Sequence, residues 1–400
     1  MEHPLFSRAL IGYEPIIDQR RNVLAMRLRI DPRDSESNLA TVYRELSALW
    51  AGADSSILLE TAAPLDEELL SLEPLERVWI EVPVAFAESE AGRTLLPLLR
   101  QRGFSMVLGG RPRQPLLPEV LAGFRLSIVD VADDRRLSPA SGVDAQARPA
   151  DPRRALPYVQ AGVRTVATME NCFKLGAQAV IGWPLNDAPG AARRDKPNPD
   201  ALTVIELIAM IDRGEDPAAM ETLIRRDATL AYRLMRYVNS PGFGLSVEVH
   251  SFRHAVMMLG YKRLKRWLAL LLVTANKDAN LRPVMVASFR RGLVLEHLVG
   301  AGQDDSLRDE VFMLGVFSLL DRLLKQPFAE LFETLNVPER VRETLVHDDG
   351  AYSPYLKVLE SVELGPDPSL PGLLDDCVTS LEHCNRAVMR ALTAPDLVAA

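Results

Sequence analysis

The chain has 400 residues, of which 48% are hydrophobic and 25% are charged, and its net charge at pH 7 is −8. This composition is typical of globular proteins, and the length favours two domains. The acidic balance argues against nucleic acid as a partner. The first residues contain no basic or apolar signal segment, and the longest strongly apolar run, residues 268–273, is too short to cross a membrane. We therefore expect a soluble, cytoplasmic protein with no membrane partner.

The chain has only three cysteines, Cys172, Cys377 and Cys384, and none of them forms a CxxC pair. A disulfide framework or a structural zinc site normally needs closely spaced cysteine pairs. We therefore expect the cysteines to be buried apolar residues, and we predict no metal site and no cofactor.

Short apolar runs alternate with helical patterns up to about residue 187. Runs typical of strands are residues 56–60, 78–82, 105–108, 126–130, 165–167 and 179–181. This alternation predicts an α/β domain with a largely parallel sheet. Because an eight-unit barrel usually takes about 250 residues, residues 1–187 predict a trimmed (βα) barrel with missing or abbreviated helices.

Two segments interrupt these patterns. Residues 133–157 are rich in Asp, Arg, Ala, Ser and Pro, and they predict a long exposed excursion. Residues 188–200 are rich in proline and predict a domain linker. From residue 201 to residue 400 apolar residues recur at helical spacing, which predicts an all-helical second domain.

Residues 13–29, YEPIIDQRRNVLAMRLR, resemble the first strand pair of EAL domains, the bacterial cyclic di-GMP phosphodiesterases. The resemblance implies a TIM-like barrel with a glutamate metal ligand in the place that Arg27 occupies here. Since Mg²⁺ and Ca²⁺ prefer anionic oxygen ligands, a guanidinium in this place would repel the ion.

The same resemblance extends along residues 10–187 and places the rest of the pocket. It aligns Glu81 with a family glutamate and Asp130 with a family aspartate. Gly109 and Gly110 take the places of two metal-binding aspartates, Ile128 that of a lysine and Ala167 that of a metal-binding glutamate. The resemblance thus implies a vestigial pocket made of Arg27, Glu81, Gly109, Gly110, Ile128, Asp130 and Ala167, with no catalytic or metal-binding residue. We expect the carboxylates of Glu81 and Asp130 to accept hydrogen bonds from backbone N–H groups or from arginine.

The helical half resembles the HDOD domain, a relative of HD-type phosphohydrolases without their His-Asp metal dyad. The resemblance is carried by residues 223–230 (LIRRDATL), 234–240 (LMRYVNS) and 249–260 (VHSFRHAVMMLG), and by an apolar helix over residues 312–324. His250 and His254 have the spacing of metal ligands, but a zinc site would need a third ligand. His347-Asp348 lies outside the expected helix and beside a turn. Neither pair is predicted to bind metal.

The combined resemblance, to a degenerate EAL domain joined to an HDOD domain, implies a bacterial signal-transduction protein that is not an enzyme and acts through protein–protein interaction. Its partners would be other signalling proteins, with homodimers as a further possibility and cyclic di-GMP as an unfavoured ligand. Two alternatives stay open. One is a receptor that binds cyclic di-GMP or another nucleotide without turnover. The other is a weak cyclic di-GMP phosphodiesterase with unusual ligands.

Overall fold

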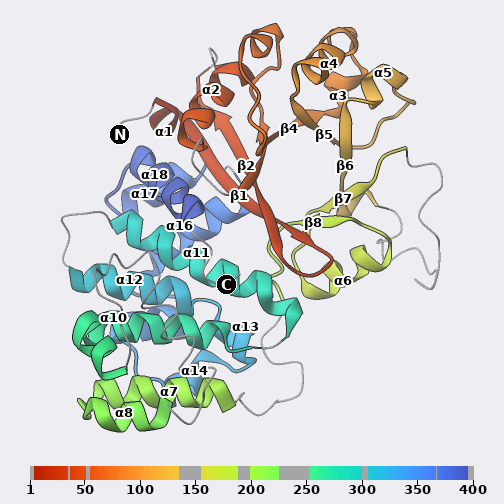
Figure 1. Ribbon diagram of the computed structural model, residues 1–400. Coiled ribbons are helices and arrows are strands. Elements are labelled where there is room, and N and C mark those ends of the chain that lie inside the picture. Colours follow the sequence, from red (N-terminus) through yellow and green to blue (C-terminus); the bar gives the residue numbers. More distant parts are fainter. Residues whose placement is uncertain are drawn as a thin grey trace. The chain divides into compact units, whose positions relative to one another are not determined.

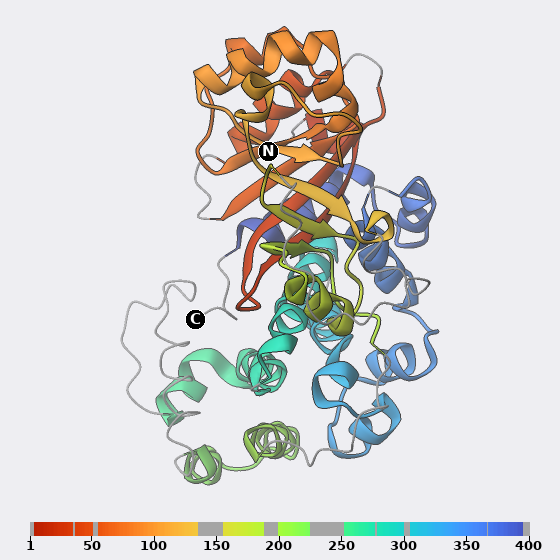
Figure 2. The ribbon, with the colours of Figure 1, turned by 90° about the vertical axis from the view of Figure 1, so that its right-hand side faces the viewer.

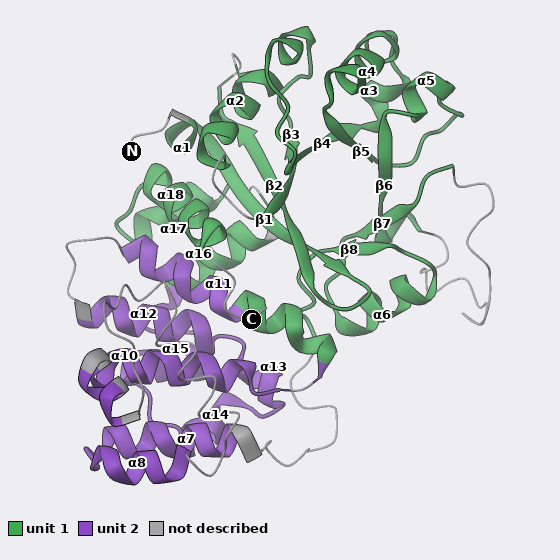
Figure 3. Ribbon diagram, in the orientation of Figure 1, with its two compact units in different colours: residues 1–187, 279–287, 354–400 green, residues 188–278, 288–353 purple. Residues whose placement is uncertain are grey.

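The computed structural model describes residues 4–34, 37–50, 55–134, 155–187, 199–224, 252–276, 278–299, 305–365 and 367–394. The chain divides into two compact units (Figure 3). Unit 1 comprises Met1–Asp187, Ala279–Ala287 and Pro354–Ala400, and unit 2 comprises Ala188–Asp278 and Ser288–Ser353. Most of the predicted excursion at residues 133–157 and of the predicted linker at residues 188–200 lies outside the described residues.

Unit 1 contains a closed barrel of eight strands that follow one another in chain order (Figures 1 and 2). The strands are β1 (Ala9–Asp18), β2 (Val23–Pro32), β3 (Ser56–Thr61), β4 (Val78–Pro83), β5 (Ser105–Gly109), β6 (Phe124–Asp130), β7 (Tyr158–Ala161) and β8 (Ala179–Ile181). The predicted barrel is thereby confirmed. However, β1 runs antiparallel to both of its neighbours, β2 and β8, whereas all other neighbours are parallel. The expected TIM-like architecture is therefore found only in part, because a tight hairpin joins β1 to β2 where a TIM barrel would have a helical crossover.

Five of the six predicted strands are present, and the sixth is wrong. Residues 165–167 begin a helix, α6 (Val166–Lys174), because the Thr165 hydroxyl accepts a hydrogen bond from the Thr168 N–H at 3.1 Å and caps the first turn. The neighbouring strand is β7, which the sequence patterns did not reveal. Small and branched apolar side chains from seven strands, including Leu58, Val107 and Ile128, pack together inside the barrel.

The helices around the barrel range from three to 13 residues, and some of them are abbreviated as predicted. They are α1 (Pro4–Arg8), α2 (Leu39–Trp50), η1 (Glu67–Ser71), α3 (Val84–Glu88), α4 (Glu90–Arg102), α5 (Pro118–Leu121), η2 (Val131–Asp133) and α6. Only η1 lies between β3 and β4, and among the described residues only the four-residue α5 lies between β5 and β6. The barrel is thus trimmed mainly by shortening its crossover helices.

The last part of the chain packs against the barrel although it is helical. This segment contains α16 (Ser353–Leu364), α17 (Leu370–Asp376) and α18 (Leu381–Thr393). In α18 the buried Asn385 side chain donates hydrogen bonds to the backbone carbonyls of Phe6, at 2.8 Å, and Ala9, at 2.7 Å. Unit 1 therefore contains helical residues from beyond residue 201 as well as the barrel.

Unit 2 consists of helices. They are α7 (Pro199–Asp212), α8 (Pro217–Ile224), α10 (Phe252–Thr274), α12 (Asp305–Phe317), α13 (Leu320–Leu324), α14 (Phe328–Thr334) and α15 (Glu339–His347). The single helix α11 (Arg282–Val299) begins in unit 1 and continues in unit 2. None of the described helices is long and apolar enough to cross a membrane.

The helix expected over residues 312–324 is interrupted. It is divided into α12 and α13, and the Ser318 hydroxyl in the break donates to the Gly315 carbonyl at 2.7 Å. Arg291 donates to the same hydroxyl at 3.0 Å. A hydroxyl that bonds to the preceding turn competes with the helical hydrogen bonds, which explains why an apolar sequence does not continue as one helix.

We expect Asn385→Ala to destabilise unit 1 by about 1–3 kcal/mol, because it leaves two buried carbonyls without their donor. Chemical denaturation followed by tryptophan fluorescence would measure the loss. Arg390→Ala, on an exposed position of the same helix, is the matched control and should change stability by less than about 0.5 kcal/mol. Equal stabilities of the two variants would contradict this account of the chain's end.

Candidate functional site

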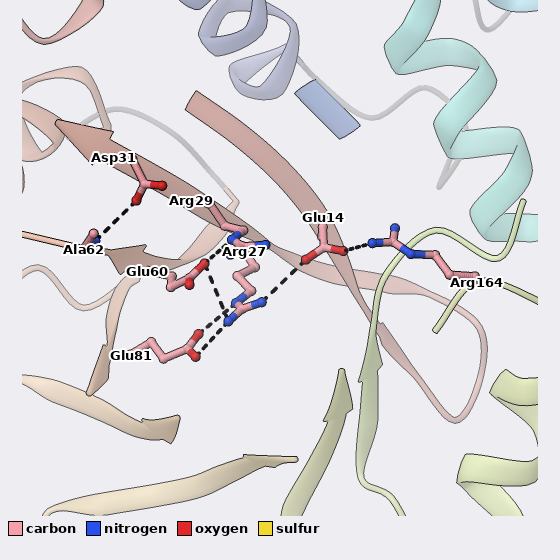
Figure 4. A network of polar contacts seen from close by, with 8 residues as sticks. All are labelled: Glu14, Arg27, Arg29, Asp31, Glu60, Ala62, Glu81 and Arg164. Carbon is pink, nitrogen blue, oxygen red and sulfur yellow. Dashed lines mark hydrogen bonds and ion pairs between the residues drawn. The ribbon is translucent and has the colours of Figure 1, made fainter. Parts of the chain in front are cut away.

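The candidate site lies at the barrel mouth and is organised by Arg27 on β2 (Figure 4). The antiparallel register of β1 and β2 places Glu14 directly opposite Arg27. Arg29 lies two residues further along β2, and side chains two apart in a strand share a face. The first two strands therefore bring one carboxylate and two guanidinium groups to the same region.

Arg27 is held by a bidentate ion pair with Glu81 of β4. Its Nε and Nη2 atoms donate to the two carboxylate oxygens of Glu81, each at 2.8 Å. The Arg27 side chain is only 11% exposed, and that of Glu81 only 9%. This planar, two-point geometry is the strongest form of arginine–carboxylate contact.

Two further glutamates approach the same guanidinium. Nη1 of Arg27 lies 3.5 Å from Glu14, and Nη2 lies 3.6 Å from Glu60 of β3. Arg29 in turn pairs with Glu60, and Arg164 lies 3.3 Å from the second oxygen of Glu14. Three arginines and three glutamates therefore form one charge-balanced network around Arg27.

The network keeps Arg27 charged. Burial by itself would lower the pKa of Arg27, but the charges of Glu81, Glu60 and Glu14 and the hydrogen bonds to Glu81 raise that pKa above its ordinary value. A buried guanidinium is stabilised only when carboxylates surround it in this way. The positively charged Arg27 side chain thus lies among the carboxylates of Glu14, Glu60 and Glu81.

Gly109 and Gly110 make room for this arrangement. A Cβ atom at position 109 would lie 2.7 Å from Oε1 of Glu81, so any side chain there would displace the carboxylate that binds Arg27. Gly110 has a φ of +107°, which favours glycine. The two glycines predicted as losses from a metal site thus leave space for the Glu81 side chain and for the turn after β5.

Of the remaining predicted site residues, Ile128 lies beside the two glycines: it pairs with Gly109 in the register of β5 and β6, and its carbonyl accepts a hydrogen bond from the N–H of Gly110 at 2.9 Å. Asp130 is exposed, and its Oδ1 accepts a hydrogen bond from the backbone N–H of Ala132 at 2.8 Å. Ile128 is buried in the barrel interior, and Ala167 lies in the first turn of α6 rather than at a strand end. The carboxylates of Glu81 and Asp130 accept hydrogen bonds from an arginine and from a backbone N–H respectively, as expected.

Three residues of the network were not singled out from the sequence: Glu14, Glu60 and Arg164. Glu60 ends a predicted strand and Glu14 belongs to the opening strand pair, so both carried a weak signal. Arg164 follows β7, which the sequence patterns missed, and its placement depends on the closure of the barrel. Among the described residues, no group of three or more His, Cys, Asp or Glu side chains is placed so that it could hold a metal ion.

Unit 2 has a polar cluster of its own. Arg266 of α10 donates two hydrogen bonds to Glu296 of α11, and its guanidinium lies 3.6 Å from the centre of the Phe312 ring. Arg308 lies 3.6 Å from the same carboxylate. Of the predicted non-ligand histidines, His250 lies outside the described residues, and His347 ends α15.

We expect Arg27→Met to destabilise unit 1 by about 3–5 kcal/mol, because it leaves the buried carboxylates of Glu81 and Glu14 without their shared counter-ion. Denaturant unfolding at pH 7 would measure the change. Arg44→Met removes an exposed arginine that pairs with Glu68, and it should cost less than about 1 kcal/mol. Similar losses of unfolding free energy in the two variants would show that the Arg27 network stabilises unit 1 no more than an exposed ion pair does.

The stability contributed by Glu296 should depend on pH. Burial alone would raise the pKa of Glu296, but the hydrogen bonds and charge of Arg266, with smaller effects of His297 and Arg308, lower that pKa overall. A carboxyl with a lowered pKa stabilises the folded state above its unfolded pKa, and this contribution is lost as pH falls through the folded pKa.

Glu296→Gln should therefore destabilise unit 2 by about 1–3 kcal/mol at pH 7. The difference from the unmodified protein should shrink as the pH falls below the ordinary glutamate value. Urea unfolding at a series of pH values would test this, with the exposed Glu333→Gln on α14 as control. A pH-independent difference would contradict the assignment.

Parts of the chain are similar to two curated proteins. One is the cyclic di-GMP phosphodiesterase CdgJ of Vibrio cholerae, which is 26% identical over 167 residues, 42% of this chain and 39% of that protein. The other is YuxH of Bacillus subtilis, which is 29% identical over 145 residues, 35% of this chain and 34% of that protein. The match thus spans well under half the length of either relative. The expectation that the chain is not an enzyme is contradicted by the first relative, which is named as a phosphodiesterase.

Solved structures show more distant similarity. The calcium and cyclic di-GMP complex of Klebsiella pneumoniae BlrP1 matches with a TM-score of 0.33 and 17% identity over 47% of this chain and 57% of that chain. The cyclic di-GMP complex of the PaMucR phosphodiesterase matches with a TM-score of 0.31 and 14% identity over 45% of this chain and 96% of that chain.

The family comparison concerns the helical half. The HDOD family model matches residues 199–334, which include α7, α8, α10 to α13 and α14. The matched residues include the Arg266–Glu296 pair and the interrupted apolar helix. The match confirms the HDOD resemblance for residues 199–334. Residues 199–334 form an HDOD domain.

Proposed function

We propose that the protein is a component of cyclic di-GMP signalling that acts through contacts with other signalling proteins. The observation that carries the proposal is the combination of an HDOD domain with a match to a relative named as a cyclic di-GMP phosphodiesterase. The proposal assigns the barrel to the EAL type. Support comes from the antiparallel β1–β2 pair at residues 9–32 and from Glu81 at the barrel mouth.

A surface on α10 supports action through protein contact. Met257 is 77% exposed and Tyr261 is 41% exposed, on either side of Gly260, where the helix is interrupted. Arg253, Lys262 and Arg263 are exposed on the same stretch, and none of them has an ion pair with a described residue. Large exposed apolar side chains next to arginine are typical of binding surfaces.

Hydrolysis of cyclic di-GMP is the second candidate function, and the name of the Vibrio cholerae relative favours it. Metal-assisted hydrolysis uses bound cations to activate water and to neutralise charge on the phosphate. In the structure the Glu81 carboxylate binds Arg27 with both oxygens, so it would have to release Arg27 before it could bind a metal ion.

Affinity capture from the native host, combined with nucleotide assays, tests both candidates. We expect the full chain to retain a specific protein partner, and Met257→Ser with Tyr261→Ser to reduce the amount captured at least tenfold, because both changes remove apolar contact area. Leu24→Ser, at an exposed leucine on β2, is the matched control and should capture normally.

Two results would contradict the leading proposal. The first is that no partner is retained by the full chain. The second is cyclic di-GMP turnover in Mg²⁺ or Mn²⁺ that is lost in Glu81→Gln while no partner is found, and this result would favour the second candidate.

A further inference from the structure

A pocket beside the helices that follow β4 and β5 shares no lining residue with the Arg27 network. It has a volume of about 310 Å³ and is bordered by the end of α3, the first turn of α4 and the segment from residue 113 to 117 that precedes α5. These three helices lie next to one another in Figure 1. The volume is at the lower end of the range for small ligands, and it suits one large side chain with its flanking groups.

The wall of the pocket is formed without a ligand. Oε1 of Glu88 accepts hydrogen bonds from the backbone N–H groups of Arg113, at 2.7 Å, and Gln114, at 3.5 Å. Prolines at positions 112, 115 and 118 further restrict this segment. A preformed wall reduces the entropy that a ligand must overcome on binding.

The pocket combines two guanidinium groups with an apolar surface. Arg93 and Arg113 are both exposed, and neither side chain has an ion pair or hydrogen bond with a described residue. The same pocket is lined by Ala87, Pro115, Leu116 and Leu117, the last of which is 46% exposed. An exposed leucine beside unpaired arginines leaves both kinds of group available to a ligand.

The charges of the pocket select among anionic ligands. Two arginines and Glu88 leave a net charge of about +1, which suits single carboxylates better than a polyphosphate or a nucleic acid strand. Arginine binds carboxylates with two parallel hydrogen bonds. The apolar wall would take an aliphatic or aromatic side chain between such carboxylates.

We propose that this pocket binds an acidic peptide segment of a partner protein, with one large apolar side chain in the pocket and neighbouring carboxylates on Arg93 and Arg113. This inference rests on the proposed action through protein contact, and it names the chemistry of the partner. The α10 surface is a separate feature of unit 2 and does not contribute to this pocket.

The test uses the full chain and fluorescent heptapeptides that carry one leucine or phenylalanine between glutamates. Fluorescence anisotropy should show saturable binding that weakens as salt increases, because exposed ion pairs are screened. Arg93→Ala and Arg113→Ala should each weaken binding about tenfold, the loss expected for a charge-assisted hydrogen bond of about 1.4 kcal/mol. Peptides with glutamine in place of glutamate should bind the unmodified chain at least tenfold more weakly than the glutamate peptides do.

Arg100→Ala is the matched control, because Arg100 is an exposed arginine of α4 that does not line the pocket. It should bind the peptide as the unmodified chain does, and circular dichroism should show all variants folded. Absence of peptide binding, or binding by Arg93→Ala and Arg113→Ala that is as tight as binding by the unmodified chain, would overturn the pocket assignment. Binding of a guanine dinucleotide that depends on Arg93 while the peptide does not bind would also overturn it. Host capture with the α10 variants is an independent measurement, so the proposed function could stand if the pocket assignment failed.

Discussion

The Arg27–Glu81 ion pair is the interaction on which the barrel mouth depends. It joins β2 to β4 across β3. Glu14 and Glu60 approach the same guanidinium. Arg164 pairs with Glu14, and Arg29 pairs with Glu60. Every charge in this network has an opposite neighbour. Because a buried charge without a partner is costly, replacement of one member affects the others.

The packing around the pair shows how closely the backbone is adapted to it. Gly109 leaves space for the Glu81 carboxylate, and Gly365, at the turn after α16, would place a Cβ atom 2.8 Å from Nη1 of Arg29. The C-terminal helices thus contact the charged strands of the barrel as well as α1, through Asn385. Residues from both ends of the chain support one unit, which explains why helices remote in sequence do not group with the HDOD domain.

The strands were largely predictable because apolar runs of strand length separated by turns leave a clear signal. The strands at 56–61 and 105–109 are examples, and the HDOD span was recognised from helical spacing and short motifs. The prediction failed where one side chain changes the local outcome. Thr165 caps a helix that its β-branched neighbours would not suggest, and Ser318 interrupts an apolar run. For the candidate site, the sequence identified Arg27, Glu81 and the two glycines, but it did not single out Glu14, Glu60 and Arg164, which complete the network.

The sequence by itself determined that an alternating α/β half precedes a helical half, and that an arginine stands where an EAL-like segment would have a glutamate. These properties are local, because they depend on spacing and residue type within a few turns of chain. Only the tertiary structure decided which carboxylates surround Arg27, since Glu14, Glu60 and Glu81 come from three strands and meet only when the barrel closes. The same holds for the C-terminal helices, because contacts between residues hundreds of positions apart leave no periodic trace in the sequence.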